Sequence, residues 1–373
     1  MPRDQAFLVA VLKKGAPKAR FEEDLQELAE LTRSAGGAVV GQVTVAIERP
    51  TPNFFISRGK LSEIRTKAIS AGANLLIFNV NLNPVQGRNI EREAGLRPVD
   101  RTGLIIDIFA RRAQSRAGRL QVELAQLTYL LPRLVGHGVI MSRTGGGIGT
   151  RGPGEQKLEV DRRKIRDRIS RVKDELEKLK AHQSRIRNRR KKKDFQVVSI
   201  VGYTNAGKSA LLNALTGSEV FVEDKLFATL DPTTRVLKVP GEKEVLLTDT
   251  VGFLNDLPHS LIEAFRATLD EVTEADALIH VIDASHPLRD AQYEAVCRVL
   301  EELNAHEKPV LLVLNKMDLL DEDEKRQISA KFPGAILISA KEKLNLGALI
   351  QAIGELANGS NGRQNEPTDR AAH

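Results

Sequence analysis

Cysteine is nearly absent from this chain of 373 residues, and Cys297 is its single example. No disulfide framework can form within the chain, which is typical of proteins that fold in a reducing compartment. Long apolar runs are also absent, since none approaches the ~20 residues needed to cross a bilayer. The first apolar run, Phe7–Leu12, lacks a preceding basic region and a following cleavage site, so it predicts a strand and not a signal peptide. We therefore expect a soluble, cytoplasmic protein without a transmembrane segment.

Aromatic residues are scarce at 4%, and tryptophan does not occur. Stacking of nucleobases on aromatic rings is therefore not expected to dominate any contact with nucleic acid. Apolar residues make up 41% of the chain, which is ample for buried cores, and 28% of the residues are charged, as is ordinary for a soluble protein. The length favours two or three domains.

Positive charge is concentrated in one segment of the chain. Residues 143–193 contain 19 Lys or Arg and 7 Asp or Glu, a local net charge of +12 against +7 for the whole chain. This distribution indicates a polyanionic partner, with RNA recognised by shape and charge as the first candidate. Residues 185–193 hold seven basic residues in nine and no acidic one, so we expect phosphate contacts there. A solvated helix face is the alternative reading of that run.

Residues 1–112 alternate between strand-like and helix-like patterns. Gly36 and Gly37 end the first helical pattern, and Gly95 ends the third. Such alternation favours a small parallel α/β domain. The expected strands are 7–12, 38–47 and 75–80, and the expected helices are 21–31, 61–71 and 84–94.

Residues 113–195 predict two helices joined by a glycine-rich loop. The second helix has apolar residues at every seventh position from Leu158 to Ile186, as in a coiled-coil seam. We expect the two helices to form an antiparallel hairpin with the glycine-rich loop at its tip. The first helix, which ends near Pro132, has one apolar face formed by Leu120, Leu124, Leu127 and Leu131.

Residues 196–357 return to an alternating α/β pattern, with a helix expected from Lys208. Residues 358–373 are polar and rich in Gly and Asn, and we predict that they form a disordered tail. The expected strands are 197–202, 245–249, 277–283, 310–315 and 336–339.

The segment Gly202–Ser209 reads GYTNAGKS and matches the phosphate-binding pattern GxxxxGK[ST] between a strand and a helix. Glycines let the backbone N–H groups face phosphate oxygens, and the helix N-terminus adds its dipole. Lys208 is expected to contact the β- and γ-phosphates, and Ser209 to bind Mg²⁺. A chance strand–turn–helix is the alternative, which the context disfavours.

Four further elements follow in the order found in GTPases. Asp249–Gly252 (DTVG) ends a strand, where Asp249 would hold Mg²⁺ through water and the Gly252 N–H would contact the γ-phosphate. Thr229 is the candidate for the switch threonine, a second ligand of Mg²⁺, and Thr233 and Thr234 are its rivals. We expect Lys208, Thr229, Asp249 and Gly252 to be the catalytic residues.

The tetrapeptide Asn315–Asp318 (NKMD) predicts the guanine site. An aspartate there accepts two hydrogen bonds from guanine, whereas adenine would leave the carboxylate unpaired. Lys316 would lie over the base, and Ser339–Lys341 (SAK) would close the pocket with backbone N–H groups. The residues expected to contact nucleotide are Gly202, Tyr203, Thr204, Asn205, Ala206, Gly207, Lys208, Ser209, Phe227, Ala228, Thr229, Leu230, Asp231, Asp249, Thr250, Val251, Gly252, Asn315, Lys316, Met317, Asp318, Ser339, Ala340 and Lys341.

Two positions bear on the rate of hydrolysis. Phe253 follows Gly252, where many GTPases carry a glutamine that orients the attacking water, and phenylalanine cannot do so. We therefore expect slow intrinsic hydrolysis that a partner stimulates. Asn205 is compatible with a K⁺ ion in the role of an arginine finger, although an asparagine that only stabilises the turn is an equal alternative.

With these motifs, the chain resembles the HflX family of translation-associated GTPases over nearly its whole length. The motifs that carry the resemblance are residues 101–134, SRTGGGIGTRGPGE at 142–155, LEVDRR at 158–163, FATLDPTTR at 227–235 and DTVGF at 249–253. The resemblance implies an α/β fold with an N-terminal parallel domain (1–112), a helical-hairpin linker (113–195) and a C-terminal P-loop GTPase domain (196–357). Asn79 departs from the family, in which we expect an acidic residue.

The resemblance also implies GTP, GDP and Mg²⁺ as ligands and the large ribosomal subunit as partner. We further expect no contact with DNA and a monomeric chain. The glycine-rich loop would then probe ribosomal RNA, whereas a simple mobile tip is the alternative. We predict a GTP-gated factor that dissociates stalled or idle ribosomes. An RNA-binding scaffold and a GTPase partnered with a tRNA-modifying enzyme are the rival hypotheses. The expected RNA contacts are Arg143, Arg151, Arg187, Arg189, Arg190, Lys191 and Lys192.

Overall fold

The computed structural model describes residues 4–15, 18–134, 153–191, 195–217, 226–227, 230–241, 243–254 and 259–362. It divides into two compact units, Met1–Lys178 with Pro258–Ala264, and Leu179–Leu257 with Phe265–His373. Among the described helices, none combines the length and the apolar character that a membrane span requires.

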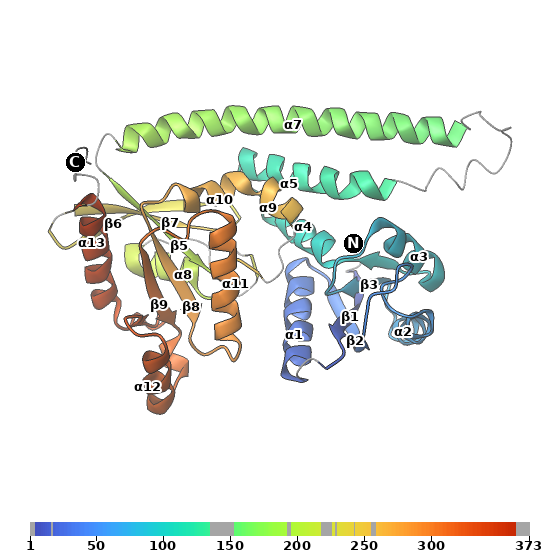
Figure 1. The fold of residues 1–373 in the computed structure, drawn as a ribbon, viewed down its shortest axis with the longest axis horizontal. Coiled ribbons are helices and arrows are strands. Elements are labelled where there is room, and N and C mark those ends of the chain that lie inside the picture. Colours follow the sequence, from blue (N-terminus) through green and yellow to red (C-terminus); the bar gives the residue numbers. More distant parts are fainter. Residues whose placement is uncertain are drawn as a thin grey trace, which may run out of the picture. The chain divides into compact units, whose positions relative to one another are not determined.

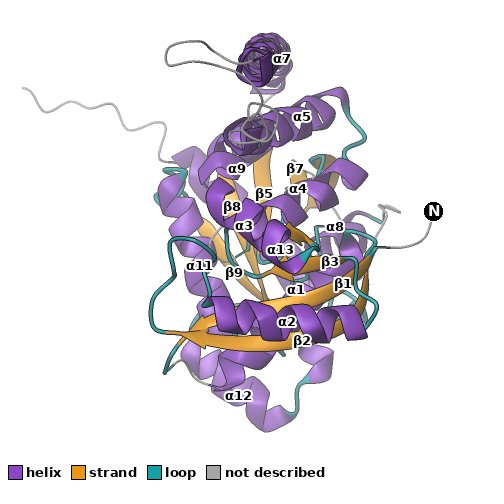
Figure 2. Ribbon diagram, turned by 90° about the vertical axis from the view of Figure 1, so that its right-hand side faces the viewer, coloured by secondary structure: helices purple, strands orange, loops and turns teal. Residues whose placement is uncertain are grey.

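The first unit contains a four-stranded parallel sheet in the order β2-β1-β3-β4, which confirms the predicted parallel α/β domain. Helices α2 and α3 cover one face of the sheet, and α2 lies in front of the strands in Figure 2. Helices α1 and α4 pack on the other face. The elements are β1 (Gln5–Lys13), α1 (Lys18–Ser34), β2 (Ala38–Ile47), α2 (Arg58–Ser70), β3 (Leu75–Phe78), α3 (Pro84–Ala94), β4 (Arg97–Val99) and α4 (Arg101–Arg112).

The sequence patterns did not predict β4 and α4. The strand β4 has only three residues, one of them Pro98, so it has too little length for an alternating pattern. Helix α4 carries the short apolar run LIIDIF, and such a run does not by itself distinguish a helix from a buried strand.

The side chain of Asn79 joins β1 to the end of β3. Its Oδ1 accepts a hydrogen bond of 2.7 Å from the backbone N–H of Val11, and its Nδ2 donates one of 3.2 Å to the carbonyl of the same residue. The amide thus closes the gap between two adjacent strands at the point where open parallel sheets often bind ligands. An acidic residue at this position could not donate the second bond.

The predicted antiparallel hairpin is confirmed by two ion pairs between α5 (Arg116–Leu130) and α7 (Pro153–Lys191), which run side by side in Figure 1. Arg116 pairs with Glu175 at 3.1 Å, and Glu123 pairs with Arg168 at 2.6 Å. Moving forward along α5 therefore corresponds to moving backward along α7. The described seam position Val172 is fully buried. Short helix α9 (His259–Ala264) belongs to the same unit and contacts α5.

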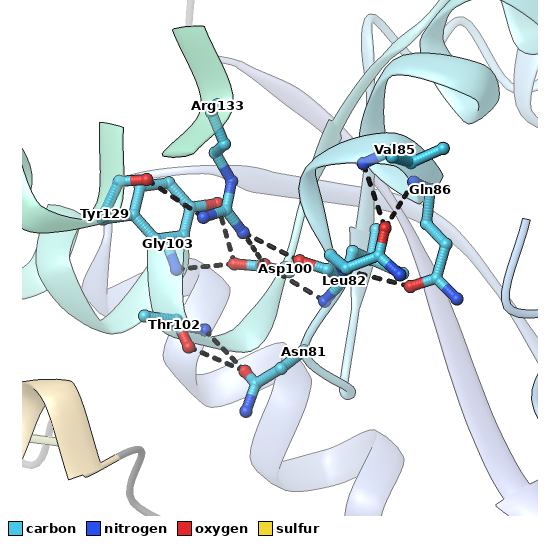
Figure 3. A network of polar contacts seen from close by, with 10 residues as sticks. Asn81, Leu82, Val85, Gln86, Asp100, Thr102, Gly103, Tyr129 and Arg133 are labelled. Atoms are coloured by element: carbon cyan, nitrogen blue, oxygen red, sulfur yellow. Dashed lines mark hydrogen bonds and ion pairs between the residues drawn. The ribbon is translucent and has the colours of Figure 1, made fainter. Parts of the chain in front are cut away.

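A polar network around the buried Asp100 fastens the C-terminal end of α5, the end that leads into the glycine-rich loop, to the N-terminal sheet (Figure 3). The carboxylate of Asp100 accepts hydrogen bonds from the backbone N–H groups of Leu82 and Gly103. It also accepts bonds from the Tyr129 hydroxyl at 2.8 Å and from Arg133 at 2.7 Å, on the 3-10 helix η1 (Leu131–Leu134). Burial, with Asp100 close by, raises the pKa of Tyr129 well above its usual value, so the hydroxyl keeps its proton and remains a donor.

The second unit contains a six-stranded sheet in the order β10-β9-β8-β5-β7-β6. All neighbours are parallel except β6, an edge strand antiparallel to β7 that the sequence patterns did not predict. Helix α13 extends to Gly362, past the predicted start of the tail at 358, and residues 363–373 lie outside the described residues. The strands are β5 (Gln196–Gly202), β6 (Thr233–Val239), β7 (Lys243–Asp249), β8 (Ala277–Asp283), β9 (Val310–Asn315) and β10 (Ile336–Leu337).

The motifs predicted from the sequence follow the carboxyl ends of four parallel strands. GYTNAGKS follows β5 in the middle of the sheet, DTVG follows β7, NKMD follows β9 and SAK follows β10. In open α/β sheets this edge is where ligands bind. The helices of this unit are α8 (Lys208–Thr216), α10 (Arg266–Thr273), α11 (Arg289–Glu302), η2 (Met317–Leu319), α12 (Glu322–Lys331) and α13 (Leu346–Gly362).

Candidate nucleotide-binding site

The loop from Gly202 to Ser209 connects β5 to the N-terminus of α8. Gly202 (φ 154°) and Gly207 (φ 92°) have backbone conformations that favour glycine. A Cβ atom at Gly202 would collide with the carbonyl oxygen of Val281, and one at Gly207 would collide with the side-chain amide of Asn315. These close contacts let the loop curl tightly at the N-terminus of α8, where backbone N–H groups and the helix dipole favour an anion.

Lys208 is buried beneath this loop, with 6% of its surface exposed. Its Nζ donates hydrogen bonds to the carbonyl oxygens of Gly202 at 3.2 Å and Tyr203 at 2.8 Å. Burial lowers the pKa of Lys208 to about 8, and the nearby Asp249 opposes part of that shift. The ammonium is therefore held by neutral carbonyl groups, which a phosphate group can replace as a stronger partner.

Two oxygen ligands suited to a magnesium ion lie together at the start of α8. The Ser209 hydroxyl donates a hydrogen bond of 2.6 Å to the carboxylate of Asp249, the last residue of β7. Hydroxyl and carboxylate oxygens are the hard ligands that Mg²⁺ takes alongside phosphate oxygens and water. The residues present therefore fit the predicted ion.

Two backbone hydrogen bonds join the segment after β7 to the phosphate loop. Phe253 N–H donates to the carbonyl of Gly202 at 3.1 Å, and Thr204 N–H donates to the carbonyl of Phe253 at 2.9 Å. A Cβ atom at Gly252 would lie 2.8 Å from Thr204 Cγ2 and 3.0 Å from Lys208 Nζ, so glycine is required there. The Phe253 side chain is buried at 1% exposure and packs inside the domain. In this position it cannot orient a water molecule.

The candidate switch threonine, Thr229, lies outside the described residues together with Ala228. Its rivals Thr233 and Thr234 belong to β6, opposite Asp249 and Thr248 in the antiparallel ladder. The Thr234 hydroxyl lies 3.1 Å from that of Thr248, so it is engaged within the sheet. This contact disfavours Thr234, whereas Thr233, opposite Asp249, stays a rival of Thr229. Phe227 and Leu230, at either side of Thr229, are buried, and Asp231 is half-buried.

Asn315 connects three of the predicted motifs. Its Nδ2 donates a hydrogen bond of 2.9 Å to the carbonyl of Ala206 in the phosphate loop. Its Oδ1 accepts a hydrogen bond of 2.9 Å from the N–H of Ala340 in SAK. Ala340 N–H, predicted to face the base, is therefore engaged by Asn315 in this structure. Asn315 itself is buried at 2% exposure, so both bonds are shielded from water.

Lys316 and Asp318 of NKMD have different surroundings. Lys316 has a left-handed backbone (φ 66°), and its Nζ forms an ion pair of 2.6 Å with Asp283 at the end of β8. Asp318 lies in η2 with its side chain exposed. The remaining member, Met317, donates its N–H to the carbonyl of Ile338 at 3.0 Å, which joins NKMD to β10.

Two residues near the site, Asp283 and His280, were not predicted from the sequence. Both belong to β8, and the signal that could have found Asp283 is an acidic residue at the carboxyl end of a central parallel strand. His280 is 2% exposed and stacks on Tyr293 with ring centroids 5.2 Å apart. Burial, and then the charge of Lys208, lower the pKa of His280 to about 3, so the imidazole is neutral at neutral pH.

The predicted RNA contacts are only partly described. Arg187, Arg189, Arg190 and Lys191 belong to the last turns of α7. The other three, Arg143, Arg151 and Lys192, lie outside the described residues, as does the glycine-rich loop.

Comparisons with known proteins find family matches in three regions of the chain. Residues 22–110 match the family described as GTP-binding GTPase N-terminal, residues 112–190 match GTP-binding GTPase Middle Region, and residues 197–316 match 50S ribosome-binding GTPase. The GTPase HflX of Caldanaerobacter subterraneus subsp. tengcongensis is 51% identical over 351 residues, which cover 94% of this chain and 80% of that protein. The chain belongs to the HflX GTPase family. The GTPase HflX of Escherichia coli K12 is 46% identical over 339 residues, or 90% of this chain and 80% of that protein.

A solved structure extends the family likeness to the fold. The crystal structure of the SsGBP and GDP complex has a TM-score of 0.50 and 27% identity to this chain, and the match covers 95% of this chain and 99% of that one. This family member is therefore a GTP hydrolase with an N-terminal parallel α/β domain, a helical region and a C-terminal P-loop GTPase domain. The resemblance inferred from its motifs is confirmed.

Proposed function

We propose that this GTPase binds the large ribosomal subunit and dissociates stalled or idle ribosomes in a GTP-dependent manner. The large ribosomal subunit is proposed as the partner because residues 197–316 match a family described as 50S ribosome-binding GTPases. The basic hairpin supplies the chemistry for contact with ribosomal RNA. Dissociation of the ribosome is the functional step that this proposal adds.

In this scheme, residues of the nucleotide site bind the phosphate groups and the metal ion. Lys208 exchanges its backbone carbonyl partners for the β- and γ-phosphates, and Gly252 N–H reaches the γ-phosphate. Ser209 and Thr229 would hold Mg²⁺, and Asp249 would act through water. Bound there, the ion would supply positive charge against the phosphates. A K⁺ ion beside Asn205, which is exposed with φ 62°, would add a further positive charge.

The described part of α7 carries a basic stripe that supports contact with RNA. Lys164, Arg171 and Lys178 are spaced seven residues apart and are all exposed. Among the described residues, none of the three has an ion-pair partner. Seven residues of helix rise by about 10.5 Å, so the stripe presents one charge at each such interval. The sequence continues it at Arg185 and Lys192.

The chain connects the γ-phosphate sensor to the hairpin by a short path. Gly252 is followed within a few residues by the segment Pro258–Ala264, which groups with the N-terminal unit, and its helix α9 contacts α5. A movement of Gly252 on GTP binding thus has a direct covalent route to the hairpin. Segments that the γ-phosphate orders and hydrolysis releases are a common means by which GTPases couple nucleotide to partner binding.

The proposal is tested by measuring GTP turnover and ribosome dissociation with purified ribosomes and large subunits. We expect large subunits to stimulate turnover strongly, because Phe253 leaves the water-orienting role open. The triple variant Lys164→Gln, Arg171→Gln and Lys178→Gln should bind large subunits more weakly, with a shallower dependence on salt, and keep its turnover without ribosomes. A matched control with the same loss of charge is Lys60→Gln, Arg65→Gln and Lys67→Gln on α2.

Three outcomes would contradict the proposal. Equal loss of binding in both triple variants would mean that the stripe is not the contact surface. Turnover that stays negligible with every ribosomal component would favour a scaffold that uses nucleotide as a structural ligand. Copurification with a tRNA-modifying enzyme, without ribosome association, would favour the remaining alternative.

A further inference from the structure

The carboxylate of Asp283 is fixed on both of its oxygen atoms. Oδ1 accepts hydrogen bonds from the Ser285 N–H at 3.0 Å and the Ser285 hydroxyl at 2.6 Å, and Oδ2 forms the 2.6 Å ion pair with Lys316. Asp283 is buried at 8% exposure. It pairs in register with Asn315, and the N–H of Ala284 donates to the carbonyl of Asn315 at 2.9 Å. The acceptor for Lys316 is therefore built into two adjacent strand ends.

Lys316 belongs to the same motif as Asp318, two residues further along. Asp318 is exposed, and it forms no ion pair with any other described residue. A lysine side chain is long and flexible, with a compact charge that seeks a carboxylate. If Lys316 lost Asp283, the one carboxylate within its own motif, Asp318, would be available as a partner. That carboxylate would then have to break an ion pair before it could accept hydrogen bonds from a base.

We infer that Asp283 is a positioning residue for guanine recognition, which holds the Lys316 ammonium and so keeps the Asp318 carboxylate available for the base. This inference rests on the proposal that Asp318 reads the guanine ring, and it is independent of ribosome binding. The same ion pair fixes the aliphatic stem of Lys316, which the base would contact. Asp283 itself contacts no base in this scheme and acts through Lys316 alone.

The substitution Asp283→Asn tests the inference with little change in volume. Ser285 offers two donors to one oxygen of residue 283, so the single amide oxygen of asparagine is expected to take that place. Its NH₂ group would then face the Lys316 ammonium. Because both groups are hydrogen-bond donors, they cannot pair, and the lysine would be released. We expect weaker binding of GDP as a result.

The informative measurement is the ratio of dissociation constants for IDP and GDP, because inosine lacks the exocyclic amine that donates to Asp318. In the unchanged protein we expect IDP to bind about tenfold more weakly or worse, since a carboxylate loses one charge-assisted bond. In Asp283→Asn this ratio should fall several-fold. In a Lys316→Met background, where no ammonium can capture Asp318, adding Asp283→Asn should not change the ratio further.

The control is Asp290→Asn, which breaks a Lys–Asp pair of the same 2.6 Å length with Lys331 between α11 and α12. It should leave both affinities and their ratio unchanged. If Asp283→Asn fails to fold, Ser285→Ala removes one bond to the carboxylate and should lower the ratio in the same direction by a smaller factor. An equal loss of GDP and IDP affinity would overturn the inference, because a purely structural role predicts that result.

A further variant separates this inference from the site assignment on which it rests. Asp318→Asn should by itself lower the IDP-to-GDP ratio. If it does not, Asp318 does not read guanine, and the site proposal fails together with the inference. If Asp318→Asn lowers the ratio while Asp283→Asn leaves it unchanged, the guanine site stands and only the role of Asp283 is wrong.

Discussion

The side-chain amide of Asn315 donates a 2.9 Å hydrogen bond to the carbonyl of Ala206, and so ties the end of β9 to the phosphate loop. The two residues are 109 positions apart in the chain. Because Asn315 also accepts from Ala340, one buried side chain holds the phosphate loop, the guanine motif and the SAK loop in a fixed relation. Its loss should therefore affect both stability and nucleotide binding.

We predict that Asn315→Ala lowers the free energy of unfolding of the nucleotide-free protein by about 1–3 kcal/mol, because it leaves a buried carbonyl and a buried N–H without partners. GDP affinity should fall as well, since the loop geometry is no longer held. Urea unfolding and fluorescent GDP titration measure the two effects. The control Asn89→Ala removes an exposed bond from α3 to the Asn53 carbonyl and should leave GDP affinity intact. Unchanged GDP affinity in Asn315→Ala would contradict the prediction.

Removing the Ser209 hydroxyl should change the magnesium requirement. In Ser209→Ala, the hydroxyl expected to bind Mg²⁺ directly is lost, so the Mg²⁺ concentration for half-maximal GTP turnover should rise about tenfold or more. Steady-state turnover at a series of Mg²⁺ concentrations measures it. Ser199→Ala removes a hydroxyl that donates to the carbonyl of Glu271 in the same domain, and should not move the Mg²⁺ curve. A parallel shift in both variants would argue against Ser209 as a ligand.

Nucleotide binding should take up a proton above neutral pH. Burial lowers the pKa of Lys208 in the free protein to about 8, and adjacent phosphates must raise it because they stabilise the ammonium. Affinity for GDP should therefore be constant below pH 7 and decline as pH rises through 8. Calorimetric titration at pH 8.5 in buffers of different ionisation enthalpy should report uptake, and the same titration at pH 6.5 should report none from this group. Proton release at pH 8.5 would contradict the predicted rise in the pKa of Lys208 on binding.

His280 should make the GTPase domain less stable in acid. Its pKa of about 3 lies below the ordinary value near 6.5, so the unfolded chain binds the proton more readily than the folded one. Stability is then unaffected above pH 6.5 and falls below it by up to about 1.4 kcal/mol per pH unit from this group. Urea unfolding of the wild type and of His280→Phe, which retains an aromatic ring against Tyr293, at pH 5 and 7.5 isolates the effect. Equal pH dependence in the two proteins would refute it.

Several elements of this protein have signals that are local in the chain, and these could be predicted from the amino-acid sequence. GYTNAGKS, DTVG, NKMD and SAK each combine a strand end with residues of fixed chemistry, so their positions and order follow from the order of the residues. The seven-residue period of α7 likewise predicts a partner helix, because a continuous apolar stripe must be covered. Glycines such as Gly207 indicate a tight loop, since a left-handed backbone suits no other residue as well.

Which of these residues meet depends on tertiary contacts. The link from Asn315 to Ala206, the ion pair of Lys316 with Asp283 and the closeness of His280 to Lys208 each join segments that are distant in the chain. Local propensity carries no information about such partners, because strand order and register bring them together. The edge strand β6 and the helix α4 were also missed, since β6 is largely half-exposed or exposed and the short apolar run of α4 does not distinguish a helix from a strand. The motifs therefore lie close together because their strands pair in one sheet, and amino-acid composition does not determine that pairing.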